Sequence, residues 1–548
     1  GVLYSRVLET YKKLESDSIV PRIFSKDPTV WTFDTQAYPE IRNRLGWLDA
    51  HQLIAKNMIE YKAIAASLKA DGIRKVLLMG MGGSSLAPEV MALTFPEADG
   101  MELQIIDSTD PGQVLQADAD HPLHETVYIV SSKSGGTAEV QAFLDYFYHK
   151  AVQALGDRAG AHFIAITDPG TLLERMAKEM NFRNVVLADP SIGGRFSALS
   201  AFGVLPAVLI GIAPEKVLEQ ASRMAKICAP SNPVASNEGA ALGVYMGTAA
   251  LSGRDKVTIL VDPNMDAFGS WLEQLIAESS GKTGKGIVPV DIEPKLNPAD
   301  YPADRAFVYI KSSGEQQSFV NQLIEAGQPV LTIKMNDLTE LFAEFYRWEI
   351  AISVACSILG VNAFDQPNVQ DSKNRTVAKI NDYKEKGALS ELPVTWEING
   401  IQAYFSSESE SMRKAESAAE LINAFASTAV QGTDYIGINA YLPRNDQTMA
   451  ALQQLREKIL KTSGCATTLG FGPRFQHSTG QLHKGGANNG LFIQIVADSV
   501  QDAEIPNEGM TFAILERAQA LGDFEALIAK ERRAIRLNLG SKRIEDLF

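Results

Sequence analysis

Two glycine- and serine-rich loops, each set between a short apolar run and a helix-like segment, constrain this chain most strongly. Residues 80–85 read Gly-Met-Gly-Gly-Ser-Ser after an apolar run at 74–79, and residues 131–137 read Ser-Ser-Lys-Ser-Gly-Gly-Thr after a run at 126–130. Such a loop presents free backbone N–H groups, hydroxyls and the positive end of a helix dipole. This combination suits a phosphate dianion. Two loops so close in sequence favour a small phosphate monoester over a dinucleotide.

The alternation of apolar runs and helix-period segments continues along the chain and predicts an α/β protein. Strands separated by helices indicate parallel sheets with helices on both faces. A third, smaller series begins with a hairpin expected around Asn399 and Gly400. The expected strands are residues 76–79, 103–106, 127–130, 163–167 and 185–188, then 257–261, 287–292, 307–310 and 330–334, then 394–398, 401–405, 435–441 and 491–496.

We divide the chain into four parts on this pattern. They are a helical leader with proline breaks at 1–45, two doubly wound parallel-sheet domains at 46–213 and 214–376, and a smaller C-terminal α/β unit at 377–548. The charged, turn-rich stretch at 374–393 is the main boundary. Helices are expected at 338–359, 411–426 and 448–461, and a charged helical segment at 515–536 is expected near the end of the chain.

Composition narrows the class of protein. The 548 residues are too many for one core, and 45% hydrophobic with 21% charged residues is ordinary for a globular enzyme. A net charge of -15 argues against nucleic-acid binding, and no apolar stretch is long enough to span a membrane. The three cysteines, Cys228, Cys356 and Cys465, form no CxxC pair. They are expected to be buried thiols of a reducing compartment, so we expect a cytoplasmic protein.

A dinucleotide site is the rival interpretation of the first loop. Asp107, after the next expected strand, stands roughly where a ribose-binding acid would be. The loop at 80–85 nevertheless lacks the third glycine of G-x-G-x-x-G, and the loop at 131–137 has no part in that fingerprint. The phosphate-monoester interpretation is therefore preferred.

Three further motifs carry residues suited to chemistry on a sugar phosphate. Arg195 lies within a glycine turn at 193–197, Glu278 ends the apolar helix that begins near residue 268, and residues 364–373 read Phe-Asp-Gln-Pro-Asn-Val-Gln-Asp-Ser-Lys. A buried guanidinium is costly unless an anion meets it. Taken singly, each motif also fits a plain structural role.

Taken together and in this order, the five motifs closely resemble phosphoglucose isomerases, whose fold has two sugar-isomerase (SIS) domains. The resemblance covers about residues 45–376. Residues 470–486 resemble the isomerase half of fused transaldolase–phosphoglucose isomerases. The resemblance implies interconversion of glucose 6-phosphate and fructose 6-phosphate, with no metal or other cofactor. It leaves open a homodimer and a covalent fusion to a transaldolase upstream.

The resemblance also assigns roles to single residues. Glu278 matches the base that moves a proton between C1 and C2, Arg195 matches the residue that stabilises the enediolate, and Lys373 matches a lysine that helps ring opening. Gln274 and Gln366 match active-site glutamines. The residues matched to the phosphate site are Gly83, Ser84, Ser132, Lys133, Ser134 and Thr137.

The chain departs from the family at the ring-opening histidine. The family places it between the equivalents of Glu278 and Lys373, but no histidine occurs here between His162 and His477. The candidates are His477 and His483, and we favour His483 because a glycine-bearing turn and an apolar strand follow it. A pKa near neutrality suits proton exchange with a ring oxygen. We therefore expect the C-terminal unit to fold back over the SIS cleft.

Two alternative functions remain open from the sequence. One is a dual phosphoglucose/phosphomannose isomerase, and the other is a non-catalytic SIS-type module that only binds a sugar phosphate. Glu278 discriminates against the second, because a sensor needs no general base. No set of side chains has convincing metal-ligand spacing; His121 and His124, three residues apart, are expected to be solvated.

Overall fold

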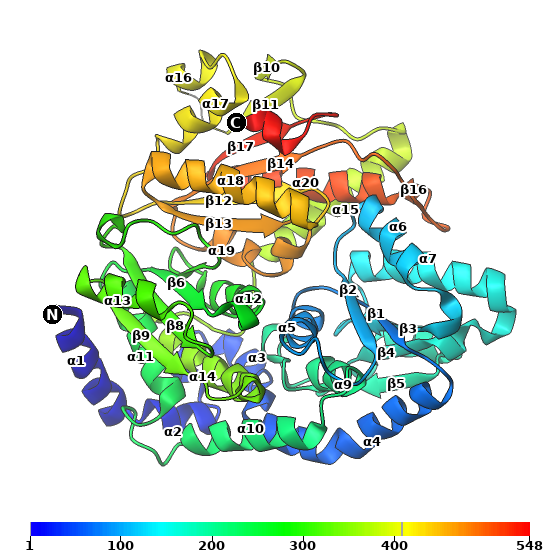
Figure 1. Ribbon diagram of the computed structural model, residues 1–548, viewed down its shortest axis with the longest axis horizontal. Helices are drawn as coiled ribbons and strands as arrows, with labels where there is room; N and C mark the ends of the chain where they lie inside the picture. Colours follow the sequence, from blue (N-terminus) through cyan, green and yellow to red (C-terminus); the bar gives the residue numbers. More distant parts are fainter. Residues whose placement is uncertain (1, 407–408) are drawn as a thin grey trace.

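Three α/β units make up the computed structural model, which describes residues 2–406 and 409–548. Two wholly parallel sheets lie side by side, and the C-terminal unit lies across the top of both (Figure 1). The predicted α/β class with two parallel-sheet SIS domains and a C-terminal unit is confirmed.

The first SIS domain is built on a five-stranded sheet in the order β2-β1-β3-β4-β5. Its central strands are buried on both faces, which explains why they read as continuous apolar runs. The strands are β1 (Lys75–Gly80), β2 (Glu102–Ile106), β3 (Thr126–Ser131), β4 (Phe163–Thr167) and β5 (Asn184–Leu187). The helices are α4 (Ala50–Ala70), α5 (Leu86–Thr94), α6 (Pro111–Asp120), α7 (Ala138–Leu155), α8 (Leu172–Glu179) and α9 (Ala201–Leu209).

The second SIS domain repeats the layout with one strand fewer, in the order β7-β6-β8-β9. The expected strand at 287–292 is shorter than predicted. The strands are β6 (Lys256–Val261), β7 (Val288–Val290), β8 (Arg305–Lys311) and β9 (Val330–Lys334). The helices are α10 (Pro214–Ile227), α11 (Glu238–Leu251), α12 (Phe268–Ser280), α13 (Gln317–Glu325) and α14 (Leu341–Leu359).

The C-terminal unit has a six-stranded mixed sheet in the order β10-β11-β17-β14-β12-β13. The hairpin around Asn399 is confirmed as β10 paired with β11. The strands are β10 (Trp396–Ile398), β11 (Ile401–Phe405), β12 (Tyr435–Tyr441), β13 (Ala466–Phe471), β14 (Gly490–Val496) and β17 (Arg533–Asn538), with a two-stranded ribbon of β15 (Glu504–Ile505) and β16 (Met510–Thr511). The helices are α15 (Val369–Lys386), α16 (Glu410–Arg413), α17 (Ala418–Ala426), α18 (Asp446–Ser463), α19 (Gly480–Gly485) and α20 (Phe512–Ala529).

Two predictions for this unit are wrong. The charged segment at 515–536 is not one helix, because α20 ends at Ala529 and β17 follows as a central strand between β11 and β14. The boundary at residue 376 falls inside α15, a single helix that packs along α20. The charges that suggested a linker therefore lie on a helix surface.

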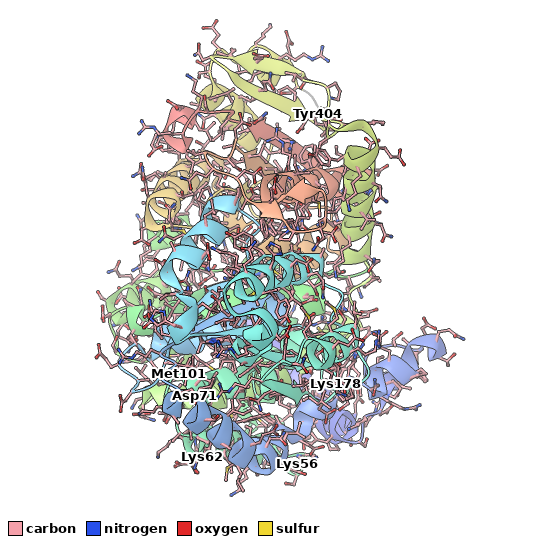
Figure 2. The ribbon with its side chains drawn as sticks, turned by 90° about the vertical axis from the view of Figure 1, so that its right-hand side faces the viewer. Lys56, Lys62, Asp71, Met101, Lys178 and Tyr404 are labelled. Atoms are coloured by element: carbon pink, nitrogen blue, oxygen red, sulfur yellow. The ribbon has the colours of Figure 1, made fainter. Side chains whose placement is uncertain are left out.

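The leader is helical, as predicted, with α1 (Val2–Ser16), α2 (Ile19–Phe24) and α3 (Tyr38–Arg42). It packs on the second SIS domain, where the Trp31 indole N–H donates to the Ser353 carbonyl at 2.8 Å. The exposed face of α4, which carries Lys56 and Lys62, lies at the opposite end of the molecule from the C-terminal unit (Figure 2).

One hydrophobic core runs through both SIS domains, a second lies on the opposite face of the first sheet and includes residues of α20, and a third fills the C-terminal unit. Cys228, Cys356 and Cys465 are buried and unpaired, as predicted. Within residues 2–406 and 409–548, no helix is long and apolar enough to cross a membrane.

Candidate active site

The two phosphate-type loops meet at one edge of the first sheet. β1 and β3 are neighbouring parallel strands with Gly80 opposite Ser131, so both loops leave the carboxyl ends together. The Ser131 hydroxyl donates to the Ser84 carbonyl at 3.1 Å and ties one loop to the other. Gly83 is pressed against the Gly194 carbonyl, which a Cβ at this position would approach to 1.9 Å. Glycine is therefore needed here to bring the first loop against the turn that carries Arg195.

The second loop is folded around Ser132. Its hydroxyl accepts from the Gly135 N–H at 3.1 Å and lies 3.3 Å from the Thr137 hydroxyl. Thr137 caps α7 by position but gives its first turn no side-chain hydrogen bond. The N–H groups at the start of this 18-residue helix are thus open to an anion. Ser134 accepts from the Gly136 N–H at 3.3 Å and is exposed at the rim.

Lys133 is held at the side of this loop. It forms an ion pair with Asp168 at 2.5 Å and donates to the Pro190 carbonyl at 3.3 Å. Burial lowers the pKa of Lys133, although Asp168 opposes that effect. Lys133 therefore already has a carboxylate partner and adds positive potential near the loop.

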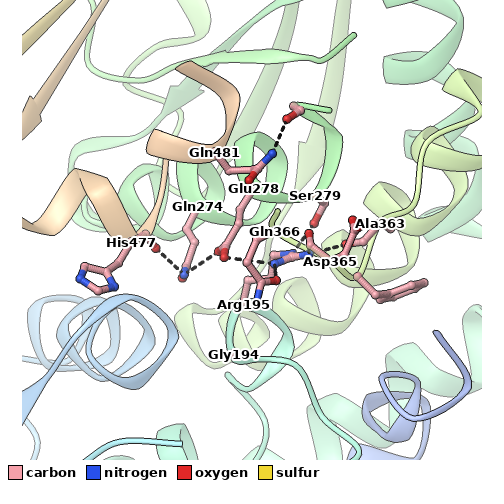
Figure 3. A network of polar contacts seen from close by, with 12 residues as sticks. Gly194, Arg195, Gln274, Glu278, Ser279, Ala363, Asp365, Gln366, His477 and Gln481 are labelled. Carbon is pink, nitrogen blue, oxygen red and sulfur yellow. Dashed lines mark hydrogen bonds and ion pairs between the residues drawn. The ribbon is translucent and has the colours of Figure 1, made fainter. Parts of the chain in front are cut away.

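Arg195 is the buried centre of the polar network in Figure 3. Its guanidinium donates to the Ser279 hydroxyl at 2.9 Å, the Gln366 side-chain oxygen at 3.1 Å and the Ala363 carbonyl at 2.6 Å. It also faces the Glu278 carboxylate, with Nη1 and Oε1 3.2 Å apart. These bonds fix the guanidinium plane. The Glu278 carboxylate supplies the negative charge that a buried guanidinium requires.

Glu278 and Gln274 lie one turn apart on α12 and face the same way (Figure 3). The Gln274 amide donates to Glu278 at 3.0 Å and to the His477 carbonyl at 2.8 Å. The side chain of Glu278 is 13% exposed, so it is accessible at the edge of the network. A carboxylate fixed by an amide on one side and a guanidinium on the other is well placed for proton transfer.

His477 reaches this site from the C-terminal unit. Its Nε2 lies 2.9 Å from the Glu139 carboxylate, which also accepts from Gln519 at 2.7 Å. Because a carboxylate only accepts, Nε2 carries the proton and Nδ1 is left as the free ring nitrogen. Burial raises the pKa of Glu139, but His477 and its hydrogen bond outweigh burial and hold the pKa below its ordinary value. An ionised Glu139 therefore orients the imidazole.

The preference for His483 does not agree with this geometry. His483 is 3% exposed, and its ring centroid lies 4.7 Å from that of Phe492 and 5.9 Å from that of Phe475. Burial lowers the pKa of His483 well below its ordinary value, and the cations of Lys484 and Arg532 act in the same direction. A neutral imidazole packed among aromatic rings is poorly suited to proton exchange. The geometry therefore favours His477 over His483 as the candidate for ring opening.

The C-terminal unit is fixed over the first SIS domain by buried ion pairs. Arg474, three residues before His477, contacts Glu89 of α5 and Asp107 at the end of β2, the latter at 2.8 Å. Asp107 also accepts from the Ser85 hydroxyl at 3.2 Å. Asp107 thus links the first phosphate-type loop to the turn that carries His477, whereas the dinucleotide interpretation would make it a ribose ligand.

The site contains two residues that sequence reasoning missed, Glu139 and Arg474. Glu139 lies only two residues after Thr137, so its place in the first turn of α7, next to a phosphate-type loop, could have marked it as a site residue. No local pattern in the sequence indicates the role of Arg474. Lys373 is exposed on α15. Its positive charge also lowers the pKa of Glu139, by less than His477 does.

The expected solvation of the two histidines near residue 121 is half right. His124 is exposed, but His121 is buried with Nδ1 2.8 Å from the Ala117 carbonyl. Among the described residues, no group of His, Cys, Asp and Glu side chains has the geometry to hold a metal ion.

Comparison with known proteins agrees with the fold and the motifs. The family model described as phosphoglucose isomerase matches residues 62–293. The glucose-6-phosphate isomerase of Rubrobacter xylanophilus is 28% identical over 375 residues, which cover 58% of this chain and 85% of that protein. The glucose-6-phosphate isomerase of Methanocaldococcus jannaschii is 26% identical over 356 residues, covering 58% and 86%.

Two solved structures share the fold. A hypothetical protein from Thermus thermophilus superposes with a TM-score of 0.56 at 21% identity, over 70% of this chain and 96% of that one. A glucose-6-phosphate isomerase from Chlamydia trachomatis gives 0.51 at 18% identity, over 67% and 78%. The matched family model, the relatives and the five motifs in order agree that this chain is similar to phosphoglucose isomerases.

Proposed function

We propose that this chain interconverts glucose 6-phosphate and fructose 6-phosphate by proton transfer through a cis-enediolate. The observation that carries the proposal is the Glu278 carboxylate, held between the Arg195 guanidinium and the Gln274 amide beside the two phosphate-type loops. The match to the phosphoglucose isomerase model and the similarity to isomerase relatives support the same reaction.

The loops hold the phosphate and thereby place the sugar. Ser84, Ser132 and Thr137 offer hydroxyls, and the start of α7 offers N–H groups and the positive end of its dipole. Gln366, bonded to Arg195, extends the polar wall toward the sugar.

Glu278 then acts on the open-chain sugar. Its carboxylate takes the proton from C2 of the aldose, the electron pair forms the C1–C2 double bond, and the former carbonyl oxygen on C1 gains negative charge. A proton then passes from the C2 hydroxyl to the oxygen on C1, and return of the first proton from Glu278 to C1 leaves the carbonyl at C2 and yields the ketose. Arg195 stabilises the developing oxyanion from a fixed position that needs no rearrangement.

The cyclic substrate must first open, and we assign this step to His477 with Glu139. The free Nδ1 exchanges a proton with the ring oxygen or the anomeric hydroxyl, while Glu139 stabilises the imidazolium that forms. Lys373 is assigned a supporting role from α15. Three buried, unpaired thiols suit a reducing compartment, and we place the reaction in the cytoplasm.

The test is a coupled assay of glucose 6-phosphate formation from fructose 6-phosphate in the presence of EDTA. We expect full activity without added metal. A parallel arm with mannose 6-phosphate measures the width of specificity. A chain that binds fructose 6-phosphate but does not turn it over would overturn the proposal in favour of a sensor.

A further inference from the structure

A polar cavity lies behind the wall of the proposed active site. Its volume is about 550 Å³, and it opens between the leader, the second SIS domain and the C-terminal unit. Asp365 and Pro367, on either side of Gln366, line it. One loop thus separates this cavity from the network around Arg195.

The charged residues of the cavity favour an anion. Lys282 is paired with Asp365 at 3.1 Å, and Lys484 with Asp523 behind the wall at 2.5 Å. Among the described residues, neither Lys530 nor Arg532 has an ion-pair partner, in a chain whose net charge is -15. The charged lining residues are Lys282, Lys484, Lys530, Arg532, Asp34 and Asp365.

Arg532 is the most telling of these residues. It is 6% exposed, its Nη2 donates to the carbonyls of Lys484 and Gly486 at 2.9 and 2.7 Å, and its Nε has no hydrogen-bond partner in the described parts of the chain. Burial lowers the pKa of Arg532. A guanidinium that is buried without a carboxylate is costly, and a bound anion would relieve that cost.

The backbone at the same wall is also suited to an anion. Asn368, at the N-cap of α15, gives this 18-residue helix no side-chain cap, and its amide oxygen already accepts from Gln481 at 2.8 Å. Pro367 and Asn368 line the cavity, so the positive end of α15 lies at its edge.

We propose that this cavity binds a small multivalent anion, carrying phosphate or carboxylate groups, at a site separate from the substrate's phosphate loops. Arg532, Lys530 and the start of α15 hold the anion. The loop that separates the two sites carries the Ala363 and Asp365 carbonyls that fix Arg195, and α15 carries Lys373. An anion bound here therefore restrains the wall of the active site from behind.

The first experiment measures binding of inorganic phosphate and of citrate by titration calorimetry. It uses a Ser132→Ala/Thr137→Ala double variant, which weakens the substrate's phosphate loop. We expect one anion per chain to remain, and the probe that binds more tightly identifies the preferred anion class. No binding of either probe to this variant would overturn the proposal.

Charge changes in the cavity then locate the bound anion. In the same background, Lys530→Glu and, separately, Arg532→Gln should each weaken binding about tenfold or more, as expected for loss of a charge-assisted contact. Lys56→Glu makes the same charge reversal on the exposed face of α4 and should leave binding unchanged. Because Arg532 is buried, Lys530→Glu gives the decisive result if Arg532→Gln does not fold. Equal affinity in Lys530→Glu and Lys56→Glu would contradict the site.

Hydrogen–deuterium exchange tests the coupling in the unmodified chain. Citrate should slow exchange in residues 361–374. If exchange slows only at 80–85 and 131–137, the anion occupies the substrate loops alone and the inference is wrong.

Discussion

At the scale of single residues, the site is a set of charges whose neighbours fix both position and protonation. Arg195 is held by acceptors from two segments, and Glu278 by a guanidinium and an amide. Glu139 is kept ionised by His477. Each proposed role can therefore be removed by a change that preserves shape.

Glu278→Gln should reduce turnover of fructose 6-phosphate by about 10²–10⁴-fold, the usual contribution of a general base. The amide keeps the size of the carboxylate but cannot accept the proton, so binding of the sugar phosphate should persist. Initial rates and substrate affinity measure the two effects separately. Glu273→Gln is the control on the same helix. Burial, and secondly Asp291, raise the pKa of Glu273 well above its ordinary value, so this side chain is held in its neutral form and the amide replaces it with no loss of charge. Similar losses in both variants would argue against a special role for Glu278.

His477→Ala should slow isomerisation of cyclic fructose 6-phosphate by about 100-fold, the lower range for acid–base catalysis. A tetrose 4-phosphate lacks a free ring-forming hydroxyl, so proton exchange on it should be largely unchanged. His483→Phe keeps the aromatic packing against Phe475 and Phe492 and should leave both rates intact. The assignment fails if His483→Phe, rather than His477→Ala, loses only the reaction of the cyclic sugar.

Local spacing made part of the site predictable. Gln274 and Glu278 are four residues apart in a helical segment, and they are hydrogen-bonded neighbours in the structure. His477 and Glu139 meet across 338 residues, and no local pattern relates them. The glycine-bearing turn favours His483 in the sequence, whereas its burial between two aromatic rings favours His477.

At the scale of elements, strands buried on both faces were predictable and charged strands were not. The expected strand at 163–167 is confirmed as β4, because a short, continuous apolar run is typical of a strand buried on both faces. β17 carries Arg533 and Arg536, which resemble the polar face of a helix. In the fold, Arg533 contacts Asp434 at 2.9 Å and Arg536 contacts Gln494, so tertiary partners replace solvent.

The loop before α7 yields a prediction at this scale. Thr137→Ala should weaken fructose 6-phosphate and inorganic phosphate together by about 10- to 100-fold, since a hydrogen bond to a charged group contributes roughly 1.5–3 kcal/mol. Competition assays measure both affinities. Thr171→Ala is the matched control. Thr171 caps α8, which follows β4 in the same sheet, and its hydroxyl accepts from the Glu174 backbone N–H at 3.2 Å. That variant should lose about 1 kcal/mol of stability and no phosphate affinity. Loss of turnover with phosphate inhibition intact would refute the loop assignment.

At the scale of the whole molecule, the active site depends on how the C-terminal unit is docked. The ion pairs of Arg474 and Arg444 with Glu89 and Asp107 cross between this unit and the first SIS domain, and the Arg474–His477 turn brings the histidine to the site. If His477 opens the ring as proposed, docking is a condition for that step as well as for stability.

Arg474→Met should lower the free energy of unfolding by about 3–5 kcal/mol, because it leaves two buried carboxylates with less compensation. It should also slow turnover of the cyclic sugar more than proton exchange on a tetrose 4-phosphate. Urea denaturation and the two rate assays measure these effects. Lys178→Met removes the surface i,i+4 ion pair with Glu174; Lys178 is labelled in Figure 2. This change should cost much less stability than Arg474→Met, because surface ion pairs contribute little. Equal costs for the two variants would mean that the buried pairs do not dock the unit.

The same network predicts how stability responds to acid. Burial raises the pKa of Glu89, but Arg474 and Arg444 outweigh burial and hold the pKa well below its ordinary value. In the unfolded chain a glutamate titrates near 4.3, so below about pH 5 the unfolded state binds more protons at this position than the native state. The stabilisation from Glu89 is therefore complete near neutrality and is lost as pH falls. Urea midpoints of the native chain should drop more steeply between about pH 7 and pH 4 than those of Glu89→Gln, which has no proton to bind there. Parallel slopes would show that Glu89 is not held ionised by its two arginines.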